Sequence, residues 1–270
     1  MKSNVGLLFV CFLMVSSCID KPYEELGNVF YKRDGDLCPS KKNHWLLDIR
    51  AKNNQDSVYL DSRQLGRKVE VHRLSVDTTS ELIQLVSSIC KGDSVLVKLR
   101  AIDFYTAFGG RVPMYLNDSD VIHSTIWMRD KLNDLEHIAF KKAFERDRID
   151  RFVKNHRWNG VLDTTTMIYY EKLTVKKGEI ERIKRAKISY MLKSLNGRVL
   201  FRTKEGEPLE YDEQDSGILP GIHFLVSKLS EGEGIRAVVP STYAYGANGN
   251  KLVSGYTPVI MEINVANNIR

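Results

Sequence analysis

The sequence predicts an α+β protein made of two copies of one small domain, with a helical linker between them. The first observation is an internal repeat, because residues 84–93 parallel residues 224–233 at a shift of 140 positions. The same shift carries Tyr105 onto Tyr245. The second observation is that a similar run of short extended segments precedes the apolar helix of each copy. A length of 270 residues is sufficient for two such domains.

A third match fixes the extent of the two copies. Residues 57–61 fall onto residues 197–201 at the same shift. Three anchors at one offset predict domains at about 28–131 and about 160–270, with a linker over 132–159. Each domain is expected to start with a pair of extended segments joined by a turn, followed by a short strand and one helix.

The hydrophobic patterns support the same elements in both copies. In the first copy the predicted strands and helix are 45–51, 58–60, 68–74 and about 79–89. In the second copy they are 187–192, 198–203, 207–211 and about 218–228. The turn at Asn196-Gly197 is a strong hairpin signal. After the second helix come a strand at 235–240, a loop over 241–249 and a closing strand at 258–265.

The second helix has one apolar face, with Leu219, Ile222, Leu225 (or Val226) and Leu229 at spacings of three and four. The aromatic loop Ser241-Thr-Tyr-Ala-Tyr-Gly-Ala-Asn-Gly follows the next strand. A loop of this kind above an apolar helix predicts a small hydrophobic pocket, which suits binding better than acid–base chemistry.

Three segments of the second copy resemble the FKBP-type peptidyl-prolyl isomerase family. They are Leu219-Pro-Gly-Ile, Leu229-Ser-Glu-Gly-Glu and, above all, Pro240-Ser-Thr-Tyr-Ala-Tyr-Gly-Ala, in the family's order. The resemblance covers nearly all of the second copy and, more loosely, the first. It implies two FKBP-like domains, each a twisted antiparallel sheet curled around one short helix, with a substrate pocket between sheet and helix.

The resemblance also implies the site residues of the second copy. Tyr245 would place a hydroxyl over the pocket, Tyr190 would line it from the first central strand, and Leu219 would offer a backbone N–H to the substrate. The other substrate-binding positions would be Leu200, Phe201, Leu209, Ile218, Ile222 and Met261. For Tyr245, a corner tyrosine that bonds a backbone carbonyl is the structural alternative.

Two positions depart from the family pattern. Phe201 replaces the usual acidic residue, or Arg202 does if the register slips by one, and Ile222 replaces the tryptophan of the pocket floor. In the first copy, Leu60-Asp61-Ser62 keeps an acidic residue and Tyr105 is present, but Ile49 stands where the strand tyrosine is expected. The first copy is therefore interpreted as structural, with Asp61 as a turn or loop-capping residue.

The function implied is a peptidyl-prolyl cis–trans isomerase, a folding helper for exported proteins. Rotation of a prolyl amide needs no nucleophile, because the barrier is the double-bond character of the C–N bond. A site lowers that barrier with apolar walls, exclusion of water and a donor to the twisted carbonyl. No cofactor and no metal are expected. The departures at Phe201 and Ile222 motivate the alternative of a non-catalytic binding or scaffold protein in a cell-envelope assembly.

The N-terminus predicts export. Residues 6–15 are an apolar run after a positive start, too short to span a bilayer and typical of a signal peptide over 1–17. The small residues before Cys18 resemble a bacterial lipobox, which implies a lipid-modified Cys18 at the membrane of the cell envelope, followed by a polar tether over 18–27. A conventional signal peptide with an incidental cysteine is the alternative. The expected partners are proline-containing segments of exported proteins.

The linker shows apolar residues at helical spacing. They are Leu132, Leu135, Ala139, Phe140, Phe144, Ile149, Phe152 and Val153. Packing of this stripe against one of the two domains is favoured over a dimerisation or spacer arm. Residues 164–170 are expected to enter the second domain as a strand.

Charge, cysteine and histidine content add further expectations. The net charge of +6 comes from interspersed residues of both signs, so a nucleic-acid role is not expected. An extracytoplasmic compartment permits a disulfide between Cys38 and Cys90, but the spacing does not require one, and two small buried thiols are favoured. The six histidines lack metal-ligand spacing.

Overall fold

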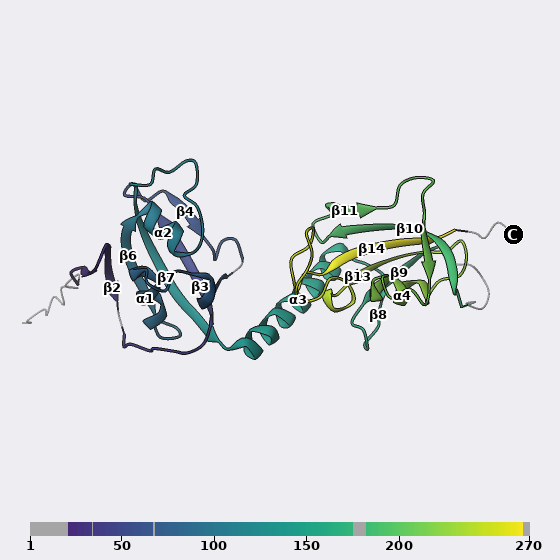
Figure 1. The fold of residues 1–270 in the computed structure, drawn as a ribbon, viewed down its shortest axis with the longest axis horizontal. Helices are drawn as coiled ribbons and strands as arrows, with labels where there is room; N and C mark the ends of the chain where they lie inside the picture. The colour runs from purple at the N-terminus through teal and green to yellow at the C-terminus, as the bar shows by residue number, and fades with distance from the viewer. Residues whose placement is uncertain (1–20, 34, 67, 175–181, 267–270) are drawn as a thin grey trace, which may run out of the picture. The chain divides into compact units, whose positions relative to one another are not determined.

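A computed structural model describes residues 21–33, 35–66, 68–174 and 182–266 of the chain. The chain divides into two compact units, Met1–Leu135 and Glu136–Arg270 (Figure 1). The predicted signal peptide and Cys18 lie outside the described residues. Within the described part, no helix is long and apolar enough to cross a membrane.

The described residues of the first unit form seven strands, two α-helices and a 3-10 turn. The strands are β1 (Glu24–Leu26), β2 (Val29–Arg33), β3 (His44–Lys52), β4 (Val58–Asp61), β5 (Val69–His72), β6 (Ser94–Arg100) and β7 (Val121–Leu132). The helices are η1 (Arg73–Ser75), α1 (Glu81–Ser88) and α2 (Ala101–Ala107).

The second unit repeats this plan. Its strands are β8 (Val161–Leu162), β9 (Tyr169–Thr174), β10 (Arg185–Ser194), β11 (Val199–Arg202), β12 (Leu209–Asp212), β13 (Gly234–Val239) and β14 (Val259–Val265). Its helices are α4 (Pro220–Val226) and η2 (Ser241–Tyr243). The long helix α3 (Asp134–His156) connects the two units in sequence.

The two sheets have the same strand order, which confirms the internal repeat. The first sheet runs β4-β3-β7-β6-β2-β1 with β5 also paired to β3, and the second runs β11-β10-β14-β13-β9-β8 with β12 also paired to β10. All of these pairings are antiparallel. The predicted fold class, α+β with two antiparallel sheets and a helical linker, is therefore correct.

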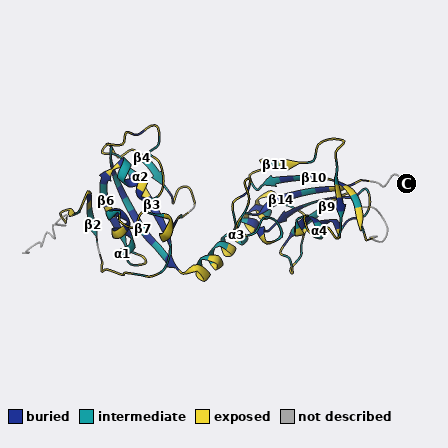
Figure 2. Ribbon diagram, viewed as in Figure 1, coloured by how far each residue is buried: buried dark blue, intermediate teal, exposed yellow. Residues whose placement is uncertain are grey.

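Each unit buries one short amphipathic helix against its own sheet (Figure 2). In the first unit α1 contributes Leu82, Ile83, Leu85 and Val86 to the core. In the second unit α4 contributes Ile222, Leu225 and Val226, and Leu229 follows just after the helix. In α4, Ile222, Leu225 and Leu229 are apolar positions that the helical periodicity predicted. They are buried because contact with the sheet removes their apolar side chains from water.

The prediction that the linker helix packs on a domain is confirmed for its second half. Ile149 and Phe152 of α3 form a small core with Val238 of β13 and Ile260 of β14. These strand residues alternate with those facing α4, so α3 and α4 cover opposite faces of the second sheet. The first turn of the stripe does not follow the prediction, because Leu135 is 79% exposed.

Two local predictions were wrong. Residues 164–167 form a turn rather than a strand, because the Asp163 carboxylate accepts backbone N–H bonds from Thr165 and Thr166, and β9 begins only at Tyr169. The end of the predicted tether is part of a sheet, since β1 pairs with β2. Tyr105, which the repeat aligns with Tyr245, lies on α2.

The expectation of two buried thiols was also wrong. Cys38 and Cys90 form a disulfide with a Cα–Cα distance of 4.9 Å and a sequence separation of 52. The backbone brings them together, because Cys38 N–H donates to the Ser88 carbonyl at 2.8 Å and Leu37 forms a β-bridge with Ile89. Sequence spacing gives no sign of this contact, which depends on the loop between β2 and β3 crossing the end of α1.

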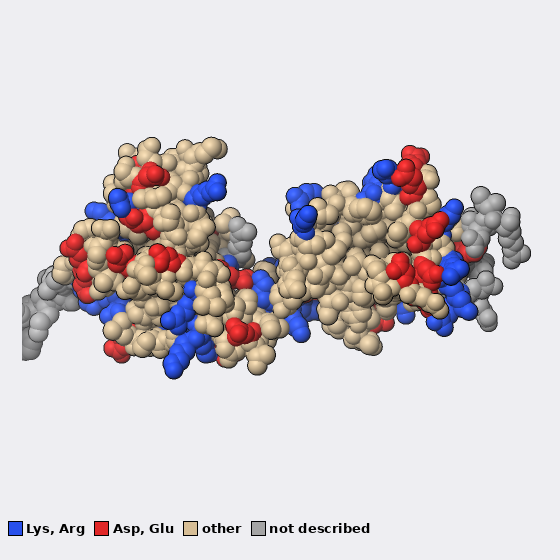
Figure 3. Space-filling model, in the orientation of Figure 1, with Lys and Arg blue, Asp and Glu red and all other residues tan. Residues whose placement is uncertain are grey.

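On the face of the molecule drawn in Figure 3, lysine and arginine are interspersed with aspartate and glutamate. The described residues also form exposed ion pairs, including Lys91–Asp130 at 2.7 Å and Arg182–Glu213 at 2.5 Å. Pairs of this kind contribute little to stability. The mixture of both signs on the drawn face differs from the focused basic face that a nucleic-acid interface needs.

Candidate functional site

The candidate site lies on the face of the second sheet that packs against α4. Tyr190 stands near the middle of β10, opposite Ile263 of β14, and Met261 of β14 is opposite Leu192. Residues paired across antiparallel strands share a face, so these side chains line one apolar surface. All four are buried in the second core.

The start of α4 closes one side of this surface. Leu219 is the N-cap residue and Pro220 takes the first helical position, where its missing N–H costs nothing. Gly221 allows the helix to approach closely, because a Cβ there would lie 2.8 Å from the Tyr243 carbonyl oxygen and 2.9 Å from a Val239 methyl. A bulkier residue at this position would push the helix away from the aromatic loop.

The aromatic loop is held from the opposite side of the sheet. The buried carboxylate of Glu145, on α3, accepts a 2.6 Å bond from the Ser241 N–H and a 2.8 Å bond from the Ser241 hydroxyl. Within the loop, Gly246 N–H donates to the Ser241 carbonyl at 2.7 Å with a φ of +66°. These contacts fix the segment that carries Tyr245.

The hydroxyls of Tyr190 and Tyr245 come close together over the apolar surface. Burial, followed by the neighbouring Tyr245, raises the pKa of Tyr190 well above its ordinary value, and burial raises the pKa of Tyr245. The Tyr190 hydroxyl is nevertheless buried without a partner in hydrogen-bond geometry among the described residues. A buried hydroxyl in this condition is ready to bond a ligand that enters the site.

The missing partner of Tyr190 corresponds to one of the sequence departures. Phe201 pairs with Leu192, so it lies on the same face as Tyr190, and the two rings are 5.6 Å apart. Arg202 pairs with Met191 on the other face, which removes the alternative register. Phe201 is 47% exposed and has no oxygen to accept from Tyr190, as an acidic residue there could.

The first unit has the same backbone hydrogen bond as the strand around Tyr190, but no tyrosine at that position. The Ser62 hydroxyl accepts from Ile49 N–H at 2.9 Å, as the Thr203 hydroxyl accepts from Tyr190 N–H at 3.1 Å. Ile49 is therefore the counterpart of Tyr190, as the sequence indicated.

The side chain of Asp61, the acidic residue that the first unit keeps, does not face the apolar surface of that unit. Asp61 pairs with Arg50, while Leu60 pairs with the buried Ala51. The Asp61 carboxylate accepts a hydrogen bond from the backbone N–H of Arg63 at 3.1 Å, which confirms the loop-capping interpretation. The sequence match that aligned Asp61 with the family's acid is thus wrong by one position.

The structure brings most of the predicted site residues onto one surface. Tyr190, Ile222 and Met261 are buried in the second core, whereas Phe201 is at its exposed edge. Five others are half-buried against that core: Leu200, Leu209, Ile218, Leu219 and Tyr245. Cys18 lies outside the described residues.

Sequence reasoning missed several residues of the same surface. Tyr170 of β9 and Phe224 of α4 stack edge to face at 5.9 Å, and Tyr243 packs on the core beside them. Tyr243 and Phe224 could have been found, because both lie within segments already singled out. Glu145 could not, since its partner Ser241 is 96 residues away.

The second unit also has an open cleft of about 440 Å³ on the opposite sheet face. Its walls include Ser189, Met191 and Arg202 of β10 and β11, with Glu262 and Asn264 of β14. These residues alternate with Leu192 and Ile263 and so face away from the apolar surface, although Tyr190 also contributes to the lining of the cleft.

We expect Tyr190→Phe to raise the free energy of unfolding of the second unit by about 1 kcal/mol, because it removes a buried hydroxyl without a partner. Tyr211→Phe is the matched control. The Tyr211 hydroxyl is bonded to His223 at 3.2 Å, and its loss should cost about 1 kcal/mol. Denaturant unfolding of both variants measures the difference, and a loss of stability in Tyr190→Phe would contradict the geometry.

The same variant should change the alkaline stability of the protein. Because burial raises the folded pKa of Tyr190, ionisation of this hydroxyl favours the unfolded chain and lowers the stability of the fold as the pH rises above about 10. Tyr190→Phe should therefore lose less stability than the wild type above about pH 10.

Comparison with known proteins identifies the class of the second unit. Residues 176–266 match the family model described as FKBP-type peptidyl-prolyl cis-trans isomerase. The second unit therefore belongs to this family, and the chain carries tandem FKBP-like domains of which the first lacks the strand tyrosine. No curated protein matches the chain.

Several solved structures are similar to the chain. The three FKBP domains of wheat FKBP73 match at 17% identity over 89% of this chain and 94% of that one, with a TM-score of 0.37. FkpA from Escherichia coli matches at 21% identity over 48% of this chain and 59% of that one, with a TM-score of 0.41. A peptidyl-prolyl cis-trans isomerase from Pseudomonas syringae pv. tomato matches at 21% identity over 46% and 93%, with a TM-score of 0.39.

Proposed function

We propose that the second unit is a peptidyl-prolyl cis–trans isomerase that acts on proline-containing segments of exported proteins. The observation that carries the proposal is the pair of tyrosine hydroxyls, Tyr190 and Tyr245, over an apolar surface within the family match. The surface combines aliphatic and aromatic walls with a small number of polar groups, as a small-ligand site does.

The proposed mechanism uses binding and desolvation alone. The proline ring lies against Ile222 and Met261, which are buried at the floor of the surface. Apolar contact removes water from the prolyl carbonyl and so reduces the resonance that makes the C–N bond stiff. The hydroxyl of Tyr245 and the N–H groups at the start of α4 are the donors available to the carbonyl as it twists.

Tyr245→Phe is expected to lower kcat/KM for a prolyl peptide about fivefold to tenfold, since it removes one donor and leaves the walls intact. The matched control is Tyr105→Phe, the counterpart in the first unit, where no change is expected. Both variants are compared in the full-length purified protein. Equal rates for wild type and Tyr245→Phe would remove the proposed role of that hydroxyl.

A second candidate is a non-catalytic binding or scaffold role, which the exposed Phe201 and the unpaired Tyr190 hydroxyl favour. Such a protein would hold an apolar segment in the same place without accelerating its rotation. It predicts that Tyr245→Ala still complements a deletion strain, whereas loss of the first unit does not. An isomerase role in the cell predicts instead that Tyr245→Ala fails to complement the deletion, whereas a protein without the first unit still complements it.

We also propose that the protein is held at the cell envelope by lipid on Cys18, on the basis of the apolar run and small residues that precede it. Cell fractionation tests this directly. A Cys18→Ser variant that stays in the membrane fraction would contradict the lipid anchor.

A further inference from the structure

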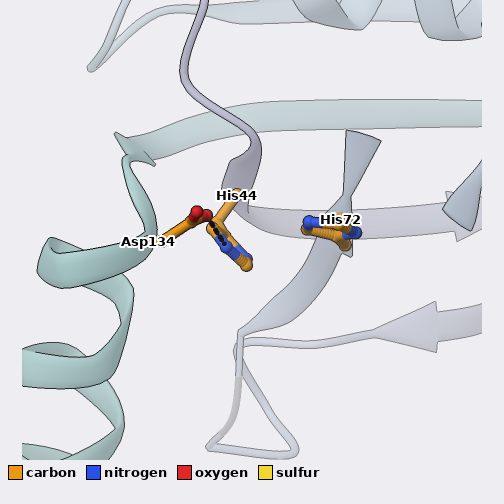
Figure 4. Close-up of side chains that lie close together, drawn as sticks. All are labelled: His44, His72 and Asp134. Carbon is orange, nitrogen blue, oxygen red and sulfur yellow. Dashed lines mark hydrogen bonds and ion pairs between the residues drawn. The ribbon is translucent and has the colours of Figure 1, made fainter. Parts of the chain in front are cut away.

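Three side chains with metal-ligating atoms meet in the first unit, away from the candidate isomerase site. They are His44 at the start of β3, His72 at the end of β5 and Asp134 at the start of α3 (Figure 4). The ligand atoms all lie within 4.8 Å of one another. This is the one group of three such residues that the described part of the chain contains.

Strand pairing explains why the two histidines meet although 28 positions separate them in sequence. His44 and His72 are direct partners across β3 and β5, so their side chains share one face of the sheet. Their ring centroids are 4.6 Å apart. Leu132, on the other side of His44, is its partner in β7, and the chain reaches Asp134 two residues later.

The distances fit a single small cation. Zinc binds histidine nitrogen and carboxylate oxygen at about 2.0–2.2 Å, so its ligand atoms lie about 3–4 Å from one another. Asp134 Oδ1 is already 2.9 Å from His44 Nε2, and His72 needs only a side-chain adjustment to complete the set. The Asp134 side chain is 73% exposed, which leaves the remaining coordination positions open to water.

A supporting contact orients the second histidine. The Ser75 hydroxyl lies 3.4 Å from His72 Nδ1, so the other ring nitrogen, Nε2, is the one left for a metal. Metal-binding histidines commonly use their second nitrogen in such a bond, which fixes the tautomer and the ring plane. Ser75 belongs to η1, the turn that directly follows β5.

We propose that His44, His72 and Asp134 form a binding site for a first-row divalent transition metal, with Zn²⁺ as the first candidate. Two imidazoles and one carboxylate suit zinc, nickel or copper, whereas calcium and magnesium prefer oxygen ligands alone. The bound ion would tie the first residue of α3 to β3 and β5. Without an ion, the same geometry is an ordinary hydrogen bond between His44 and Asp134 beside a second, tilted histidine ring.

The test is equilibrium binding of Zn²⁺ and Co²⁺ to the full-length protein, produced without a polyhistidine tag and first freed of metal by chelation. We expect one Zn²⁺ per chain, and a Co²⁺ complex whose visible absorption is that of a mixed nitrogen and oxygen site. His72→Gln and Asp134→Asn should each weaken binding about tenfold or more. The two substituted residues lie on different elements, β5 and α3. Weaker binding in both variants would therefore indicate loss of a metal ligand, because one local unfolding event would not explain both.

His123→Gln is the matched control, because His123 is also a histidine of the first unit but is bonded to Asn54 at 2.6 Å instead. Its affinity for metal should equal that of the wild type. No stoichiometric binding, or equal affinity in wild type, His72→Gln and Asp134→Asn, would overturn the proposal and leave the hydrogen bond as the role of these residues.

Discussion

Glu145→Ala is expected to lower the free energy of unfolding of the second unit by about 3 kcal/mol. Glu145 is 5% exposed and its carboxylate accepts both the N–H and the hydroxyl of Ser241. Truncation leaves two buried donors without a partner, and each lost bond to a charged group costs about 1.5–3 kcal/mol, partly recovered by relaxation. Hydrogen exchange of residues 234–239 and 259–265 measures the loss in the intact chain.

Two variants make this experiment specific. Glu145→Gln keeps an acceptor and a donor of the same shape, so we expect it to lose about 1 kcal/mol. Asp147→Ala lies on the same helix but is exposed in an i,i+4 pair with Arg151, and should change stability by less than about 0.5 kcal/mol. An effect of Glu145→Ala no larger than that of Asp147→Ala would contradict the role assigned to the buried carboxylate.

Because Ser241 begins the segment that carries Tyr243 and Tyr245, the effect should reach the candidate site. The linker helix was predicted as a surface element with one apolar stripe. In the structure this helix, α3, has a second role. Its buried Glu145 bonds Ser241 and so positions the aromatic loop, while its apolar stripe packs on the sheet. Glu145 is thus a positioning residue, and Glu145→Ala should also lower any isomerase activity of the chain.

Reduction of the Cys38–Cys90 disulfide is expected to destabilise the first unit by about 4 kcal/mol. The bridge closes a loop across a sequence separation of 52, and the chain-entropy estimate for a loop of this length is about 4 kcal/mol. The neighbouring contacts form only when the loop is in place, including the two bonds of 2.7 Å from Lys131 Nζ to the Cys38 and Ser87 carbonyls.

The second unit serves as an internal control, because residues 136–270 contain no cysteine. Hydrogen exchange before and after treatment with a thiol reductant should show faster exchange in β3, β6 and β7 and no change in β10, β13 and β14. A Cys38→Ser, Cys90→Ser double variant should behave like the reduced protein. Unchanged exchange in the first unit would contradict the assigned contribution.

The repeat, the strand succession and the two short helices were predictable because they depend on local periodicity. The apolar stripe of α4 and the hairpin at Asn196-Gly197 each occupy a few consecutive residues. The strand predicted over 164–167 was wrong. A run of threonines favours a strand, but the Asp163 side chain stabilises a turn there.

Features that depend on distant contacts were not predictable. The pairing of His44 with His72, of Cys38 with Cys90 and of Glu145 with Ser241 each requires the completed sheet. The face on which Asp61 and Phe201 lie depends on an irregularity in the pairing of β3 with β4 and of β10 with β11. A shift of one residue reverses the face, so sequence alignment alone could not assign these two side chains.

The central claim, that the tyrosine-bearing surface of the second unit is a prolyl isomerase site, is tested most directly by the rate of cis–trans exchange in a peptide with one proline. Uncatalysed exchange takes tens to hundreds of seconds at 25 °C. With the full-length purified protein at micromolar concentration, we predict an exchange rate that rises in proportion to protein concentration and is lowered by Tyr245→Phe but not by Tyr105→Phe. An exchange rate that stays at the buffer value at every protein concentration would contradict the claim.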